Sequence, residues 1–101
     1  MADLVRFRTA FTGELVYWRG PSPFHFVPVP PPQAAEIGFL APMVTYGWGA
    51  IPARVRIGRT EFTTSLFPKD GGYLVPIKDK VRKAEDLTVG DVVHLELAIG
   101  R

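Results

Sequence analysis

A short apolar run occurs twice in this chain, 48 residues apart, and this repeat limits the folds that the chain can adopt. Residues 26–29 (FVPV) correspond to residues 74–77 (LVPI), and each run precedes a segment with a helical pattern. The last strands of the two halves agree as well, because residues 55–59 (VRIGR) correspond to residues 97–101 (LAIGR) after a gap of six residues. Since an internal repeat decides topology, the pattern predicts two halves related by a pseudo-twofold axis. Chance similarity between two β-rich halves is the alternative.

Most of the remaining chain has the period of two that is typical of half-buried β-strands. Apolar and polar residues alternate in residues 5–11, in residues 51–57 and again in residues 92–99. Residues 60–67 are rich in threonine and aromatic side chains, which also favour strands. The sequence therefore predicts six or seven strands once the two repeated runs are included.

Glycine-containing turns join these strands. Gly58-Arg59 fits the first-position glycine of a two-residue hairpin, and Asp70-Gly71 supplies the positive φ angles that a second hairpin requires. Gly13 is expected to mark a β-bulge, because the alternation of apolar residues resumes after it.

Two short helices are expected, one after each copy of the repeated run. The prolines at residues 30–32 can pre-set the first turn of a helix over residues 33–40. Asp79 can cap a second helix over residues 80–87. The whole pattern predicts one mainly β domain over residues 1–101, closed into a small barrel because closure removes exposed strand edges.

The composition excludes several classes of protein. A chain of 101 residues with 47% hydrophobic content can bury one core of its own. It has no cysteine, which rules out disulfides and thiolate metal sites. No apolar run approaches the ~20 residues of a membrane helix. We expect a cytoplasmic protein without membrane, metal or cofactor, acting as a monomer or a weak dimer.

Positive charge is concentrated in the second half of the chain. Residues 54–83 hold eight Lys or Arg and three Asp or Glu, a net charge of +5, whereas the rest of the chain carries −3. Such asymmetry is compatible with an anionic partner. A solvated face of mixed charge is the alternative.

The strongest concentration lies where the second helix is expected to begin. Four cations cluster there, and they are followed by Glu85 and Asp86 near the expected end of the helix. This order opposes the helix dipole, which favours acidic side chains at the start and basic ones at the end. We therefore predict an anion-binding site there. The cations are Lys78, Lys80, Arg82 and Lys83, with Trp48, Lys69 and Tyr73 in support. The alternative is that Asp79 caps the helix and the cations point into water.

Other candidate chemistry is poorly supported. His25 and His94 are the only histidines, and a mononuclear zinc site needs about three organised protein ligands. No catalytic residue is assigned. The candidates for lining a ligand groove or for stacking on bases are Trp18, Tyr46, Trp48 and Tyr73, although core packing is the commoner role of large aromatic side chains.

From residue 11 to residue 97 the chain resembles the uncharacterised bacterial family called domain of unknown function nineteen-oh-five. The resemblance implies a small β-barrel of the double-split kind, and it implies no established activity. The matching segments are residues 11–15 (FTGEL), 47–49 (GWG), 63–69 (TTSLFPK), 73–78 (YLVPIK), 81–84 (VRKA) and 90–91 (GD).

A more distant resemblance is to AbrB-type DNA-binding antitoxins and regulators. Val81-Arg82, then Leu87, then Gly90-Asp91 before alternating apolar residues are similar to the helix-turn-strand half of that fold. The chain departs from that family in having Lys78 where the family has proline. Kinship of fold is therefore implied more strongly than DNA binding.

These observations give three functional hypotheses. The first is a non-catalytic binding module for an anionic small molecule. The second is an AbrB-like nucleic-acid-binding protein or antitoxin-type regulator. The third is a small enzyme whose reaction the sequence does not specify.

Overall fold

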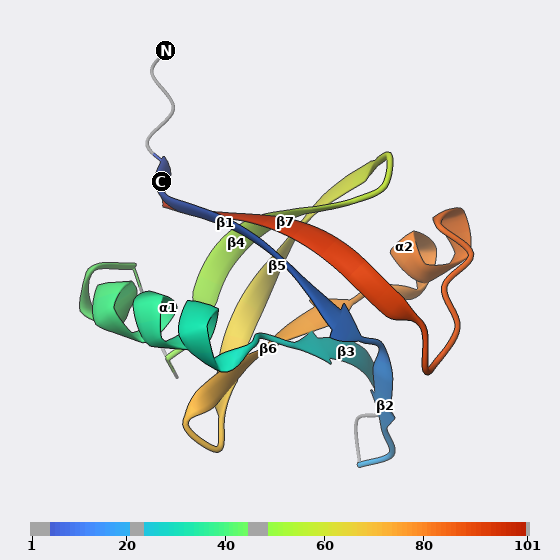
Figure 1. Cartoon of the computed structure of the whole chain (residues 1–101), viewed down its shortest axis with the longest axis horizontal. Coiled ribbons are helices and arrows are strands. Elements are labelled where there is room, and N and C mark those ends of the chain that lie inside the picture. The colour runs from blue at the N-terminus through green and yellow to red at the C-terminus, as the bar shows by residue number, and fades with distance from the viewer. Residues whose placement is uncertain (1–4, 21–23, 45–48, 101) are drawn as a thin grey trace.

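The computed structural model describes residues 5–20, 24–44 and 49–100 (Figure 1). Its elements are β1 (Val5–Glu14), β2 (Val16–Trp18), β3 (Phe24–Pro28), α1 (Pro31–Val44), β4 (Ile51–Ile57), β5 (Thr60–Lys69), β6 (Gly72–Ile77), α2 (Asp79–Ala84) and β7 (Val92–Gly100). The seven strands form one antiparallel sheet in the order β1-β7-β4-β5-β6-β3-β2. The mainly β class, the seven strands and the two helices confirm the coarse prediction.

The sheet curls because two stretches of chain change their pairing partner. The strand β1 pairs with β7 as far as Glu14, whereas β2 pairs with β3 from Val16 onward, so the chain turns a corner at Leu15. Similarly, β5 pairs with β4 up to Leu66 and with β6 from Phe67. The two strands at the ends of the sheet order are thus consecutive in the chain. The structure is a curled half-barrel, and closure into a double-split barrel stays a prediction.

The corner residues fill the inside of the curl. Leu15 and Leu66 are both fully buried. The peptide groups of Leu15 are satisfied by the turn before β7, because its N–H donates to the Asp91 carbonyl and its carbonyl accepts from the Gly90 N–H, both at 2.9 Å. The corner therefore leaves no backbone group of Leu15 without a partner.

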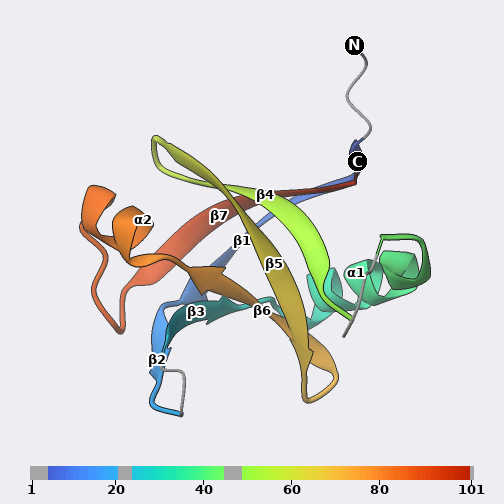
Figure 2. The same cartoon turned by 180° about the vertical axis from the view of Figure 1, so that it is seen from behind.

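One hydrophobic cluster occupies the interior, and alternate residues of the strands supply most of it. The helix α1 adds Ala34 and Ile37 from one end of the curled sheet, and α2 adds Val81 from the other. Figure 1 and Figure 2 show the two helices at these opposite ends. The buried strand residues at the centre include Val27, Ile51, Val55, Val75, Leu95, Leu97 and Ile99.

The strand register has the symmetry of the sequence repeat. Val27 pairs with Val75, its own counterpart 48 residues later, and this pair lies at the centre of the contact between β3 and β6. Between β4 and β7, Val55 pairs with Leu97, its counterpart in the second repeated segment. Each half therefore contacts the other through equivalent residues, which is the arrangement that a pseudo-twofold axis produces.

The prediction of a bulge at Gly13 is wrong. Gly13 pairs in register with Val93, and the one irregularity between β1 and β7 falls between Val5 and Phe7. Gly13 is needed for a different reason, since a Cβ atom there would lie 2.6 Å from Val27 Cγ1 and 3.2 Å from a backbone oxygen of β3. The absence of a side chain lets β1 cross close to β3.

The predicted hairpins are confirmed, but both helices differ from their predicted bounds. Gly58 (φ +59°) and Asp70-Gly71 (φ +52° and +80°) form the two turns. The helix α1 starts earlier and ends later than expected, and it carries Pro42 within it. The helix α2 starts and ends earlier than expected, and its N-cap residue is Lys78 rather than Asp79, with no side-chain capping bond.

Candidate functional site

The predicted anion site lies on α2 and the residue before it. Lys78, Lys80 and Lys83 are exposed, and Arg82 is half-buried. Arg82 reaches back along its own helix, where its Nη2 atom lies 3.4 Å from Asp79 Oδ1. Three of the four predicted cations thus extend into solvent, and the fourth faces an acidic side chain of the same helix.

Asp79 also lies near β3. Its Oδ1 atom is 3.9 Å from Nδ1 of His25, and the ring of His25 contacts that of Tyr17 at a centroid distance of 4.8 Å. Asp79 therefore stands between His25 and Arg82. Its carboxylate partly balances the positive charge that the sequence placed at this position.

The order of charges along α2 does not oppose the helix dipole, contrary to the prediction. Asp79 lies in the first turn, and Arg82 and Lys83 lie in the last turn. Glu85 and Asp86 follow the helix instead of ending it. This arrangement complements the dipole. The charge reversal that motivated the anion site is absent, and the site itself stays a prediction.

The early end of α2 has a specific cause. Asp86 adopts a left-handed conformation with φ +54°, its N–H donates to the carbonyl of Lys83, and the N–H of Leu87 donates to that of Arg82. This pair of bonds is a Schellman motif, which normally uses glycine at the left-handed position. The Glu85 carboxylate then accepts from Oγ1 of Thr60, which ties the end of α2 to the β4–β5 hairpin.

The residues predicted to support the site lie elsewhere. Tyr73 is at the start of β6 and Lys69 is at the end of β5, whereas α2 follows the far end of β6. Five residues of extended strand separate Tyr73 from Lys78 by about 16 Å. Figure 1 shows the β5–β6 hairpin and α2 well apart. Tyr46 and Trp48 fall outside the described residues.

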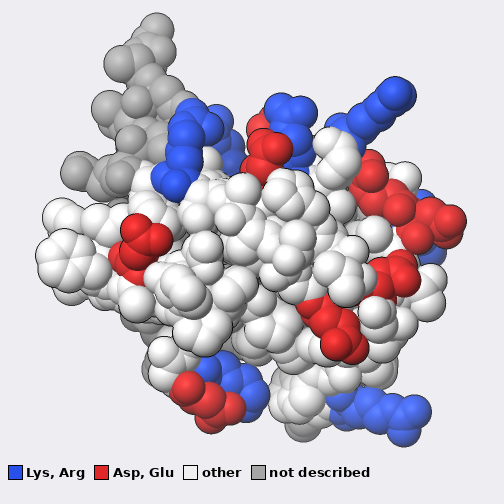
Figure 3. Space-filling model, in the orientation of Figure 1, with Lys and Arg blue, Asp and Glu red and all other residues white. Residues whose placement is uncertain are grey.

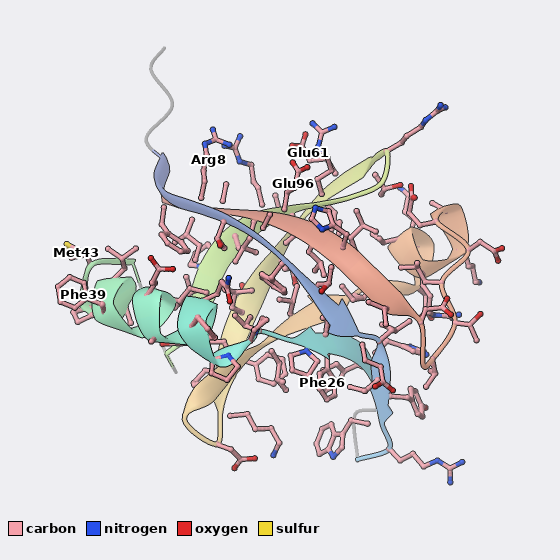
Figure 4. All side chains as sticks on the ribbon, in the orientation of Figure 1. Arg8, Phe26, Phe39, Met43, Glu61 and Glu96 are labelled. Atoms are coloured by element: carbon pink, nitrogen blue, oxygen red, sulfur yellow. The ribbon has the colours of Figure 1, made fainter. Side chains whose placement is uncertain are left out.

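A different group of side chains converges on the outer face of β2, β3, β6 and the end of β5. The ring of Phe24 is central, with centroids of three other aromatic rings within 5.6 Å: Trp18 at 5.6 Å, Phe26 at 5.2 Å and Phe67 at 5.4 Å. None of these four rings belongs to the hydrophobic core or packs against it as a partly buried neighbour. Figure 4 labels Phe26 below β3, on the side facing away from Arg8.

These rings line a groove of about 400 Å³. This volume lies within the ~300–1,000 Å³ range of small-molecule sites. Lys69 and Asp70 add charged groups to the groove, with Lys69 Nζ 4.0 Å from Asp70 Oδ2. We call this site the aromatic groove; its lining residues are Trp18, Phe24, Phe26, Phe67, Pro68, Lys69, Asp70 and Leu74.

The opposite part of the same sheet shows what an ordinary outer face looks like in this protein. The outward residues of β1, β7, β4 and the first part of β5 are largely polar or charged, including Arg54, Arg56, Glu61, His94 and Glu96, all of them exposed. Antiparallel sheets with one solvated face normally follow this pattern. The aromatic groove departs from it, which marks this face as the candidate functional site.

Trp18 was predicted from the sequence as a groove candidate, whereas Phe24, Phe26 and Phe67 were not. Residues 24–29 (FHFVPV) are apolar at nearly every position, so no alternation shows which side chains face the core. A signal was nevertheless present. A strand that is apolar on both faces needs a packed layer against each face, and a chain of 101 residues has few residues left to form the second layer.

Two further features bear on the chemistry. Among the residues that the structure describes, no three His, Cys, Asp or Glu side chains gather closely enough to hold a metal ion. Within the same residues, neither helix is long and apolar enough to cross a membrane. His94 is exposed on β7, where buried and exposed residues largely alternate.

Comparison with known proteins yields a family and no activity. Neither the curated proteins nor the solved structures give a match to this chain. The family described as Domain of unknown function (DUF1905) matches residues 11–97, which include the corner at Leu15, both repeated runs and all four rings of the groove. The match spans most of the chain. The chain therefore belongs to the DUF1905 family.

Proposed function

We propose that this protein is a non-catalytic binding module whose ligand lies in the aromatic groove and combines a planar apolar group with an anionic group. The observation that carries the proposal is the cluster of four aromatic rings on an outer sheet face, outside the core. Exposed apolar surface is costly in water, and burying it under a ligand recovers about 25 cal/mol for each Å² covered.

The arrangement of the rings favours a planar ligand group. Trp18 and Phe67 stand steeply to Phe24, at interplanar angles of 74° and 62°. Trp18 is also 44% exposed, so part of its surface is accessible to a partner. Aromatic rings prefer offset-stacked or edge-to-face neighbours, and a ligand ring can supply either contact here.

Lys69 supports the anionic part of the proposal. Its side chain is 53% exposed, and its partner Asp70 is 89% exposed. An ion pair between groups this exposed contributes little, because water and salt screen it. The ammonium group of Lys69 is thus free to turn from Asp70 toward an anionic ligand at the end of the groove.

An aromatic anion with a planar naphthalene ring, 1-anilinonaphthalene-8-sulfonate, tests this proposal by fluorescence titration of the folded protein. We expect saturable binding, and we expect Trp18→Ser to weaken it by about 5- to 150-fold because a stacked ring contributes about 1–3 kcal/mol. Lys69→Glu should weaken binding of the dye as well. Lys69→Met keeps the apolar stem of the side chain and removes only its charge, so any weakening by this variant measures the contribution of the ammonium group.

Phe39→Ser is the matched control, since Phe39 is an aromatic side chain that is 83% exposed on α1, away from the groove. Its removal should leave the affinity unchanged. The proposal is wrong if Phe39→Ser abolishes binding of the dye or if Trp18→Ser leaves the affinity as it was.

Anion or nucleic-acid binding by α2 stays a second proposal, supported by its exposed cations and by the buried Nε atom of Arg82, which has no hydrogen-bond partner among the described residues. Inorganic tripolyphosphate at 100 times its Kd should then stabilise the protein by about 2.7 kcal/mol, which raises Tm by roughly 10 °C. Lys80→Glu/Arg82→Glu should remove this increase.

A single-stranded oligonucleotide distinguishes the nucleic-acid form of this second proposal. Its affinity should fall with salt at a log–log slope of about −0.7 for each phosphate neutralised. An unchanged Tm with tripolyphosphate and an oligonucleotide affinity that does not change with salt would together contradict anion binding and nucleic-acid binding by α2. Neither result would bear on ligand binding in the aromatic groove.

A further inference from the structure

The helix α1 is apolar on its outer face as well as on the face that packs against the sheet. Ala34 and Ile37 are buried in the core, whereas eight residues of the helix are exposed, and Glu36 is the only one of these eight with a polar side chain. A helix at a protein surface normally turns polar side chains to water, and a helix that is apolar on all sides is normally buried. We call these eight residues the outer face of α1; they are Pro31, Pro32, Ala35, Glu36, Gly38, Phe39, Pro42 and Met43.

Two large side chains dominate this outer face. Phe39 is 83% exposed and Met43 is 59% exposed. Ala35, Phe39 and Met43 are four residues apart from one another, so they form one stripe along the helix. Figure 4 shows Phe39 and Met43 projecting away from the sheet, and Figure 3 shows mostly uncharged surface at this end of the molecule. The cores of protein–protein interfaces are likewise rich in aromatic residues and Met and poor in charged residues.

A groove of about 410 Å³ lies beside this stripe, between α1 and β1. Phe7 of β1 and Leu40 of α1 form its floor, and both pack against the core. We call it the α1 groove; its lining residues are Phe7, Ala35, Glu36, Phe39 and Leu40. The protruding ring of Phe39 therefore stands next to a recess that can accept an apolar side chain.

The charge and the size of the outer face restrict what can cover it. Glu36 is the one charged residue of α1, so the face is complementary to a surface with little charge of its own. The 14 residues of the helix make a face about 21 Å long and about 10 Å wide, roughly 200 Å², which is well below the ~800 Å² that each partner of a stable complex buries. A second copy of the same face meets both conditions, because it is equally uncharged and a twofold axis makes each contact twice.

We propose that a second copy of this chain covers the outer face of α1, with the two helices antiparallel about a twofold axis at Phe39. In this pairing Ala35 of each copy faces Met43 of the other, so a small side chain opposes a large one. Each Phe39 ring lies over the α1 groove of the other copy. The two Glu36 carboxylates are at least about 9 Å apart along the helix axes, farther than the Debye length of ~8 Å at physiological ionic strength, so their repulsion is screened. The aromatic groove lies elsewhere and is unaffected by this contact.

Sedimentation equilibrium of the whole chain, from about 10 µM to about 2 mM, tests the proposal. We expect a monomer–dimer equilibrium with a Kd of about 0.1–1 mM, as for other small and transient interfaces. Because no ion pair holds this interface, the Kd should change by less than about 2-fold between about 50 mM and about 500 mM salt. On dilution of the ¹⁵N-labelled protein, amide shifts should move in residues 32–43 and around residue 7. A protein that stays monomeric, or dilution shifts that lie outside these residues, would overturn the proposal.

Phe39→Ser should weaken the dimer by at least about 10-fold, because a central aromatic side chain contributes most to such a contact. Phe39 is not among the side chains that pack against the core, so the variant should fold with its Tm little changed. Val92→Ser is the matched control, since it removes another apolar side chain, 75% exposed, from β7. Its Kd should equal that of the wild type, and an unchanged Kd for Phe39→Ser would contradict the pairing.

An exchange of side chains tests the antiparallel register. Ala35→Met alone sets two methionines against each other and should weaken the dimer by about 10-fold, the effect of overpacking. The double variant Ala35→Met/Met43→Ala restores one small and one large side chain at each contact, so its Kd should return to within about 3-fold of the wild type. A double variant that is as weak as Ala35→Met would refute this register. Co-sedimentation of a monomeric protein with phosphatidylcholine vesicles would assign the face to a lipid surface instead and would also overturn the proposal.

Discussion

Replacing Leu66 by alanine should lower the free energy of unfolding by about 2–5 kcal/mol, the usual cost of a large cavity in a core. Leu66 is fully buried at the point where β5 leaves β4 and joins β6. Because corner backbone and core packing meet there, the surrounding side chains cannot collapse into the space. Leu15→Ala removes the counterpart at the other corner and should have an effect of the same size.

Urea denaturation measures both changes. Val92→Ala provides the control, since Val92 is 75% exposed and its truncation should change stability by no more than about 0.5 kcal/mol. A loss below about 1 kcal/mol for both leucine variants would show that the corners do not hold the curled sheet together.

Adding a single methyl group at Gly13 should destabilise the protein by about 1–3 kcal/mol, the usual cost of overpacking. The new Cβ atom would lie 2.6 Å from Val27 Cγ1, and Val27 is fully buried. The lower entropy of the unfolded alanine chain offsets this loss by only ~0.4–1 kcal/mol.

Gly38→Ala is the matched control for Gly13→Ala. Gly38 lies in α1, and nothing stands within 4 Å of the position that its Cβ would take. Alanine favours a helix over glycine by about 0.8–1 kcal/mol, so this variant should be more stable than the wild type. Equal effects of the two substitutions in thermal unfolding would contradict the close crossing of β1 and β3.

Local signals were sufficient for the strands and turns. The alternation in residues 51–57 places Ile51, Val55 and Ile57 inward, and all three are buried. The glycine at Gly58 and the Asp70-Gly71 pair set their hairpins because few other residues tolerate the φ angles of those turns. Such features depend on neighbours in the chain, and for this reason sequence reasoning recovers them.

Local signals failed where a distant segment decided the outcome. Gly13 has the pattern of a bulge, yet its role depends on Val27 in another strand. The end of α2 was misplaced because Asp86 takes a position that glycine usually holds and because Thr60, far away in sequence, binds the carboxylate of Glu85. The prediction that the charged side chains oppose the helix dipole followed from this misplaced end, because it counted Glu85 and Asp86 as part of the helix.

The candidate site shows the same division. The cations of α2 are conspicuous in the sequence because they are adjacent in the chain. The rings of the aromatic groove come from β2, β3 and β5, and only strand pairing brings Trp18, Phe24 and Phe67 together.

The sequence by itself determined the mainly β class, the hairpins and the repeat, whose counterparts Val27 and Val75 pair with each other. Only the tertiary structure decided which face of each apolar strand is covered. A run such as residues 24–29 is apolar on both faces, and its composition is the same whether the second face meets a core or solvent. The curl of the sheet encloses one face and leaves the rings of the other outside, because one short chain supplies a single core.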